Sequence, residues 1–304
     1  MPKGPRREKR LGVRARCLAM IASCGVAVLV AFGGPSSAET LRERGEYLVT
    51  TIGACGVCHT PRDVAGKPIA SMALAGGFEF DVPALGHIIP PNITPDSETG
   101  IGNWSEAQII TALREGKRPD GTIIGPPMPI RLFRQLSDRD AAAIAAYLHS
   151  LKPIRHAVGR TQFKIPLPTA YGPTVEHVED PSHADKVAYG GYLLGAVGNC
   201  VGCHTPPGNK GPSDMSRGYS GGRELPDADN PGALTISRNI TPDPEDGIGK
   251  WSDDEIKRAI TTGIRPDGTR LSRTMPFDWY AKIAPADLDA IVAHLRSLKP
   301  LKTQ

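Results

Sequence analysis

A long internal repeat constrains the fold of this chain more than any other feature. Residues 90–121 match residues 237–268 at a constant offset of 147, and residues 143–153 match residues 290–300 at the same offset. A chain of 304 residues is long enough for two ordinary domains. The repeat therefore predicts two copies of one unit joined head to tail.

Each unit is predicted to be helical. Ser105 and Ser252 each precede a Gln or Glu by three residues, which is the pattern of a capping box at the start of a helix. These helices are expected to end at Gly116 and Gly263, which can adopt the left-handed conformation of a helix C-terminus. The Gly/Pro-rich stretches between the helices show no alternating apolar pattern, so the expected fold class is all-α.

Both copies contain the pattern Cys-x-x-Cys-His. Two thiols one helical turn apart can form thioether bonds to the two vinyl groups of a haem, while the adjoining imidazole binds the iron from one side. The pattern therefore predicts two covalently bound haem c groups. The residues are Cys55, Cys58 and His59 in the first copy, and Cys200, Cys203 and His204 in the second.

Zinc and disulfides are the alternatives for these cysteines. A zinc ribbon normally brings its second cysteine pair within a few tens of residues, whereas 141 residues separate Cys58 from Cys200. A disulfide gives no reason for a histidine to follow each pair. Aromatic residues make up only 5% of the chain, and a haem in each unit would supply bulk that its core lacks.

The sixth iron ligand determines what each haem can do. A methionine sulfur favours reversible electron transfer, whereas an open position allows reaction with peroxide or other small ligands. Met128 and Met275 align at the offset of 147, and each is followed by Pro. They are therefore the predicted sixth ligands, ahead of Met72 and Met215, which lie in stretches that share little else.

Two further matched pairs have weaker assignments. Arg118 and Arg265 each precede the sequence "PDG" and could bind haem propionates through forked hydrogen bonds, or could be solvated turn residues. Trp104 and Trp251 are assigned to packing at the start of a helix, rather than to hydrogen bonding with a propionate.

The first 38 residues have the order of a secretory signal peptide. Seven Lys/Arg residues precede an uncharged apolar run, and small residues lead to a cleavage site after Ala38. Cleavage would remove Cys17 and Cys24 and leave the protein in the periplasm. Two alternatives stay open: an uncleaved run of 18 apolar residues that anchors the chain in the cytoplasmic membrane, or a lipoprotein-like site at Cys24.

The same segment accounts for the positive charge of the chain. The whole sequence has 36 basic and 32 acidic residues, but residues 1–38 alone carry a net charge of +6 and leave the remainder at −2. No basic patch interleaved with aromatic residues remains, so nucleic acid is excluded as an expected partner. The expected organisation after residue 38 is a first haem c domain at 39–153, a linker at 154–180 and a second haem c domain at 181–304.

The motifs "CGVCHTPRD", "NITPDSETGIGNWS", "RPDG", "PPMP" and "AAIAAYLHSLKP" resemble those of the cytochrome c subunits of bacterial periplasmic and membrane-bound dehydrogenases. Such dehydrogenases oxidise alcohol, aldehyde, gluconate or nicotinate. The resemblance covers nearly all of residues 40–153 and 181–300. It implies two tandem class I cytochrome c domains without catalytic residues of their own. It also implies a catalytic dehydrogenase subunit as electron donor and a quinone or an oxidase as downstream acceptor.

Two other functions compete with this one. A dihaem peroxidase also carries two such motifs in a chain of this length, but it needs one open or displaceable iron position, which the matched Met-Pro pairs argue against. A free soluble electron shuttle would lack a large docking surface. For electrons to pass between two fixed haems, the two units are expected to pack as pseudo-symmetric halves.

Overall fold

The computed structural model describes residues 39–303, apart from residues 209–212 and residue 231. Residues 1–38, with Cys17, Cys24 and the expected cleavage site, lie outside the described residues, so the signal peptide stays a prediction. Residues 39–304 form one compact unit. No helix in its described part combines the length and the apolar character needed to cross a membrane.

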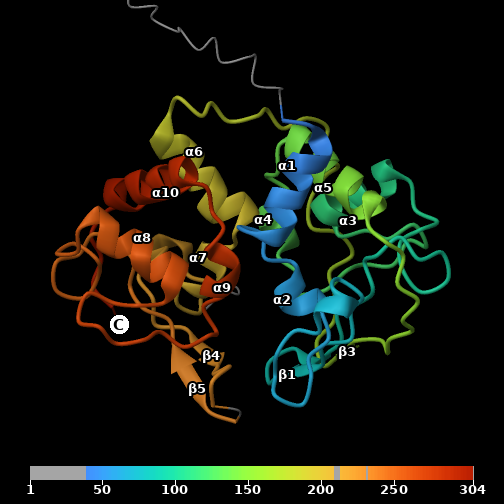
Figure 1. Ribbon diagram of the computed structural model, residues 1–304, viewed down its shortest axis with the longest axis horizontal. Coiled ribbons are helices and arrows are strands. Elements are labelled where there is room, and N and C mark those ends of the chain that lie inside the picture. The colour runs from blue at the N-terminus through green and yellow to red at the C-terminus, as the bar shows by residue number, and fades with distance from the viewer. Residues whose placement is uncertain (1–38, 209–212, 231, 304) are drawn as a thin grey trace, which may run out of the picture. The chain divides into compact units, whose positions relative to one another are not determined.

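The two repeats contain helices in the same order (Figure 1). Short turns of 3₁₀ or π type lie between them, at Ala70–Met72 (η1), Leu193–Val197 (η2) and Met215–Arg217 (η3). The first repeat has α1 (Leu41–Thr50), α2 (Gly56–His59), α3 (Glu106–Glu115), α4 (Ile130–Phe133) and α5 (Asp138–Ser150). The second has α6 (Lys186–Tyr192), α7 (Cys200–Cys203), α8 (Asp253–Thr262), α9 (Phe277–Tyr280) and α10 (Pro285–Ser297).

The predicted limits of α3 and α8 are confirmed. Each helix begins with a complete capping box, in which a serine accepts a main-chain N–H and a Gln or Glu side chain accepts one in return. Gly116 and Gly263 end the helices at φ values of 65° and 69°, in the left-handed region that glycine adopts without a steric cost.

The all-α prediction is only partly right, because the described residues also form short antiparallel strands. Each strand is two or three residues long, which is too short for an alternating apolar pattern to be recognised in the sequence. One sheet has the order β1-β2-β3 and the other pairs β4 with β5. The strands are β1 (Phe80–Val82), β2 (Gly86–Ile88), β3 (Gln162–Phe163), β4 (Glu224–Pro226) and β5 (Leu234–Ile236).

Within each repeat the first and last long helices cross at a glycine. A Cβ atom on Gly45 of α1 would lie 1.9 Å from the carbonyl oxygen of Ala143 in α5. A Cβ atom on Gly190 of α6 would lie equally close to the carbonyl of Ala290 in α10. Only glycine allows the backbones to approach this closely, so both repeats are built on the same helix crossing.

The two repeats pack against each other through reciprocal contacts. The hydroxyl of Tyr47 donates to Asp287 at 2.7 Å, and the matched hydroxyl of Tyr192 donates to Asp140 at 2.8 Å. Each hydroxyl also accepts the N–H of the residue at the N-cap position of the facing helix, Ser137 for α5 and Ala284 for α10. Because each repeat gives the other the same pair of contacts, the expectation of pseudo-symmetric halves is confirmed.

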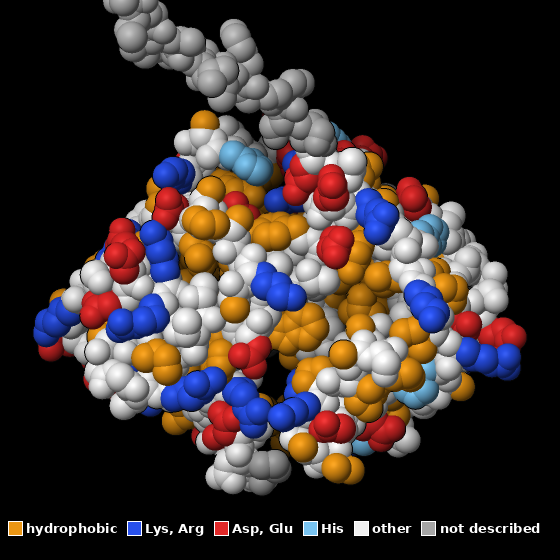
Figure 2. Space-filling model, viewed as in Figure 1, with side chains coloured by type: hydrophobic (Ala, Val, Ile, Leu, Met, Phe, Trp, Pro, Cys, Tyr) orange, Lys and Arg blue, Asp and Glu red, His pale blue; other side chains and the backbone are white. Residues whose placement is uncertain are grey.

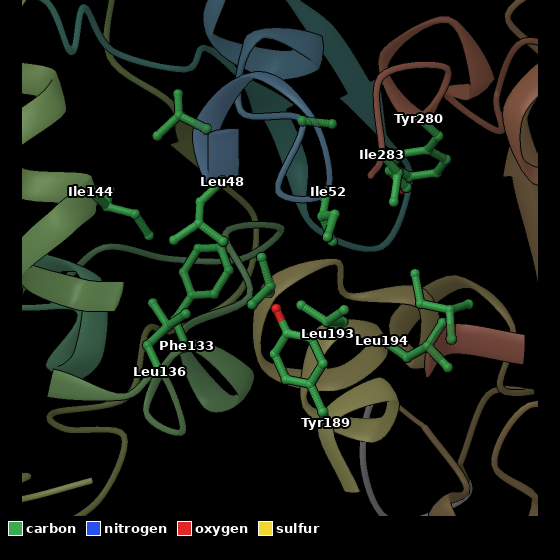
Figure 3. Packing of buried hydrophobic residues seen from close by; sticks show 14 of the residues in the cluster. Leu48, Ile52, Phe133, Leu136, Ile144, Tyr189, Leu193, Leu194, Tyr280 and Ile283 are labelled. Carbon is green, nitrogen blue, oxygen red and sulfur yellow. The ribbon is translucent and has the colours of Figure 1, made fainter. Parts of the chain in front are cut away.

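One apolar core joins the halves. In the space-filling view, hydrophobic side chains gather along the middle of the face where the repeats meet (Figure 2). Leu48 and Ile52 of the first repeat belong to the same buried cluster as Leu193, Leu194 and Tyr280 of the second (Figure 3). This core and the reciprocal hydrogen bonds together hold the two repeats against each other.

The segment 154–180, predicted as a linker, is tied to the first repeat. Its strand β3 pairs with β2, and the hydroxyl of Thr161 donates to the carbonyl of Ile89 and accepts the N–H of the same residue. Further along, the carbonyl of Val178 accepts the N–H of Asp138 at the start of α5.

Candidate haem-binding sites

A single helical turn carries both thiols and the imidazole in each repeat. The N–H of His59 donates to the carbonyl of Cys55 at 3.0 Å, and the N–H of His204 donates to that of Cys200 at 2.9 Å. The residue before the first cysteine of each motif has a positive φ of 43° or 52°. This uncommon conformation turns the chain from the preceding helix into the motif in both repeats.

Each histidine is oriented through its Nδ1 atom. His59 Nδ1 donates to the carbonyl of Pro91 at 2.8 Å, and His204 Nδ1 donates to the carbonyl of Arg238 at 2.7 Å. Burial lowers the pKa of both histidines, which favours the neutral ring. A neutral ring with its proton on Nδ1 presents Nε2 as a metal ligand.

An Asn-x-Thr sequence holds each of these carbonyls in place. Asn92 directly follows Pro91, and its Oδ1 accepts the N–H and the hydroxyl of Thr94, while its Nδ2 donates to the carbonyl of Ile154 at 2.8 Å. Asn239 makes the same bonds to Thr241 and to the carbonyl of the matched residue 301. Sequence reasoning missed this role, although the repetition of "NIT" in both copies was a signal for it.

The thiols fit thioether attachment to haem. All four cysteines in the described residues are free, and burial raises the pKa of Cys55 to about 12 and that of Cys58 to about 11. Nowhere in the described part of the chain do three or more His, Cys, Asp or Glu residues gather to hold a metal ion. Each motif thus offers two thiols that can add to haem vinyl groups and one imidazole nitrogen that can bind the iron, which fits a haem c, whereas a structural zinc site needs four metal ligands.

Met128 and Met275 lie at equivalent places in the two repeats. Each side chain is half-buried and packs against the shared core just before α4 or α9. An antiparallel β-bridge closes the turn between α3 and Met128, from Lys117 to Ile123. A matching bridge from Ile264 to Arg270 closes the turn between α8 and Met275. Met215, in contrast, is 61% exposed. The assignment of Met128 and Met275 as sixth ligands stays a prediction.

Arg118 and Arg265 each make hydrogen bonds within the turn that follows them in the chain. Arg118 donates to the carbonyl of Ile123 at 3.0 Å, and Arg265 donates to the hydroxyl of Thr269 at 3.3 Å. Binding of a propionate by either arginine also stays a prediction. Trp104 and Trp251 pack against the shared core, which confirms their assignment to packing.

Comparison with known proteins agrees with the two sites. A family model described as cytochrome c matches residues 43–152 and again residues 190–299, so that each match contains one Cys-x-x-Cys-His motif. The chain belongs to the cytochrome c family. Its two domains carry two covalently bound haem c groups, as the spacing of the cysteines predicts.

The named relatives are of two kinds: subunits of dehydrogenases, and a dihaem cytochrome. A nicotinate dehydrogenase subunit of Pseudomonas putida is 31% identical over 95% of this chain and 24% of its own length. The cytochrome c subunit of alcohol dehydrogenase (quinone) of Gluconobacter oxydans is 34% identical over 74% of this chain and 47% of its own length. A dihaem cytochrome c-type protein of Cereibacter sphaeroides is 30% identical over 74% of each chain. This cytochrome therefore spans a quarter to about half of the first two relatives.

Proposed function

We propose that this cytochrome is a non-catalytic subunit that relays electrons from the catalytic subunit of a periplasmic dehydrogenase towards the respiratory chain. The observation that carries the proposal is the presence of two matched attachment sites in one continuous core. Relatives named as subunits of nicotinate, alcohol, fructose and gluconate dehydrogenases support it.

The residues of each domain suit repeated gain and loss of one electron, which is the chemistry that a bound haem supplies. Covalent attachment through two cysteines keeps the group in place in both oxidation states. The hydrogen bond from His59 Nδ1 to Pro91 orients the ring and increases its basicity, and His59 is 8% exposed, so water has little access to it. Met128 and Met275, if they bind the irons as predicted, would leave neither haem with an open position, which would disfavour the peroxidase alternative.

The proposed donor is a catalytic dehydrogenase subunit, and the proposed acceptor is a quinone-reducing or oxidase partner. The experiment mixes the reduced catalytic subunit that co-purifies with the cytochrome with oxidised cytochrome and follows both haems by stopped flow. We expect rapid reduction within a complex that survives gel filtration. If reduction occurs only at rates set by random collision and no complex survives, the free shuttle replaces the dedicated subunit.

The proposed location is the periplasm, supported by the order of basic, apolar and small residues in 1–38. Mass spectrometry of the protein from its native membrane should find an amino terminus at Glu39. A full-length chain would instead support a membrane anchor, and a lipid on Cys24 would support a lipoprotein.

A further inference from the structure

Helix α9 of the second repeat carries two consecutive aromatic residues next to the two attachment motifs. Trp279 lies against Gly56, inside the first motif, and a Cβ atom on Gly56 would be only 2.2 Å from its indole ring. Tyr280 is buried, and burial together with the nearby thiols of Cys200 and Cys203 raises its pKa well above the usual value. The side chain of Trp279 therefore crosses from the second repeat to the first, while Tyr280 stays beside the second motif.

The chain segments that lead into the two motifs also meet. A Cβ atom on Gly198, two residues before the second motif, would lie 3.1 Å from the side chain of Ile52 in the first repeat. Ile52 faces Leu193 and Leu194 across this contact (Figure 3). The two attachment motifs are thus on neighbouring sides of the contact between repeats, and Trp279 is a large side chain of the second repeat that touches the first of them.

The contact between Trp279 and Gly56 has no equivalent Trp–Gly pair at the matched positions of the repeats. The residue that matches Trp279 at the offset of 147 is Leu132, and the residue that matches Gly56 at the offset of 145 is Val201. Residues needed to attach a haem are the same in both copies. A small residue opposite a large one in only one copy therefore points to a task other than attachment.

The side chain of Trp279 is only partly buried. Its ring helps to line a hollow of about 330 Å³ between the repeats, together with Thr50 and Pro68 of the first repeat and Asp278 and Lys282 of the second. A smaller side chain at 279 would enlarge this hollow instead of opening a sealed cavity in the core, so substitution here is compatible with folding.

We propose that Trp279 is a positioning residue that fixes the first attachment motif against the second and so sets the rate of electron exchange between the two haems. The proposal rests on the proposed function as a two-haem relay. The exchange involves one electron only: one ferrous haem is oxidised for each ferric haem reduced, and no bond is made or broken.

The test uses the isolated dihaem protein, half-reduced by a chemical reductant, and needs no dehydrogenase. Two-dimensional exchange NMR of the haem methyl signals at several protein concentrations separates exchange within a molecule from exchange between molecules. Trp279→Leu, which introduces the residue found at 132, should slow the intramolecular exchange by roughly tenfold or more, because the rate depends steeply on how the two haems are positioned. Trp279→Phe, which keeps an aromatic ring against Gly56, should restore most of the rate.

Gly56→Ala provides an independent check from the other side of the contact. The added methyl group should slow exchange in the wild-type background, because it meets the indole ring, and should have little further effect when Trp279 is already Leu. Leu132→Ala changes the matched position in the first repeat and serves as the control, for which no change in exchange rate is expected.

Visible and near-infrared spectra establish that both haems remain bound and six-coordinate in each variant. Wild-type exchange in an intact Trp279→Leu protein would overturn the inference and leave the proposed function untouched. If Trp279→Leu loses a haem, Gly56→Ala decides: unchanged exchange in that variant overturns the inference, and slowed exchange supports it. A failure of the proposed function appears separately, as no reduction by the dehydrogenase partner.

Discussion

Replacing Asn92 by Ala should destabilise the first domain and loosen the support of His59. The Asn92 side chain is 2% exposed, accepts the N–H of Thr94 at 2.9 Å and donates to the carbonyl of Ile154 at 2.8 Å. Alanine would leave the N–H of Thr94 without this partner, and the carbonyl of Ile154 would keep only the longer bond from the hydroxyl of Thr94, at 3.3 Å. Because each buried polar group without a partner costs about 1–3 kcal/mol, we expect the free energy of unfolding to fall by about 2–4 kcal/mol.

Denaturant unfolding of the haem-loaded protein measures this loss, and Asn103→Ala is the matched control. Asn103 is exposed, and its side chain makes a hydrogen bond to the carbonyl of Ser97, so its replacement should change the free energy of unfolding by less than about 0.5 kcal/mol. Asn239→Ala, at the equivalent position of the second repeat, should cost a similar amount, because Asn239 bonds to Thr241 and to the carbonyl of Leu301 as Asn92 bonds to Thr94 and to that of Ile154.

A second readout separates support of the histidine from stability alone. Asn92 is covalently joined to Pro91, whose carbonyl accepts the proton of His59 Nδ1, so the substitution should shift the reduction potential of one haem and leave the other unchanged. If Asn92→Ala costs no more than Asn103→Ala, the hydrogen-bond reasoning is wrong. If it costs about 2–4 kcal/mol but leaves both potentials unchanged, the carbonyl does not depend on Asn92 for its position.

Three further outcomes are expected. Ferric protein should show a near-infrared band from methionine sulfur bound to iron, and Met128→Ala and Met275→Ala should each remove about half of its intensity; one high-spin haem in the unmodified protein would contradict both assignments. Gly45→Ala should lower the free energy of unfolding by about 1–3 kcal/mol in thermal or denaturant unfolding, because its Cβ meets the α5 backbone. A hydrogen bond from Arg114 and a second from His177 lower the pKa of Asp138, so the wild-type protein should be more stable than Asp138→Asn above about pH 4, and this advantage should disappear as the pH falls through the lowered pKa. Acid titration of the two proteins would show parallel curves if these hydrogen bonds contributed nothing.

Features that depend on side-chain identity were predictable from the repeat, and features that depend on the main chain were not. The capping boxes at Ser105 and Ser252 could be predicted because only a few side chains can cap a helix. The carbonyls that orient the two histidines belong to Pro91 and Arg238, which are unlike each other because a main-chain acceptor places little demand on its own side chain. Only the neighbouring "NIT" sequence, which both copies keep, marked these places.

The contact between the repeats shows a second limit of sequence comparison. Tyr47 and Tyr192 are the same residue because a pseudo-twofold interface uses the same surface of each copy, so its residues look like any other residues shared by the copies. Trp279 differs from Leu132 at its matched position and therefore had no signal in the repeat. Yet a relay with a separate entrance and exit requires the two halves to differ. The shared residues explain how each half holds its haem, and the unmatched contact of Trp279 with Gly56 is a difference between the halves that lies directly at an attachment motif.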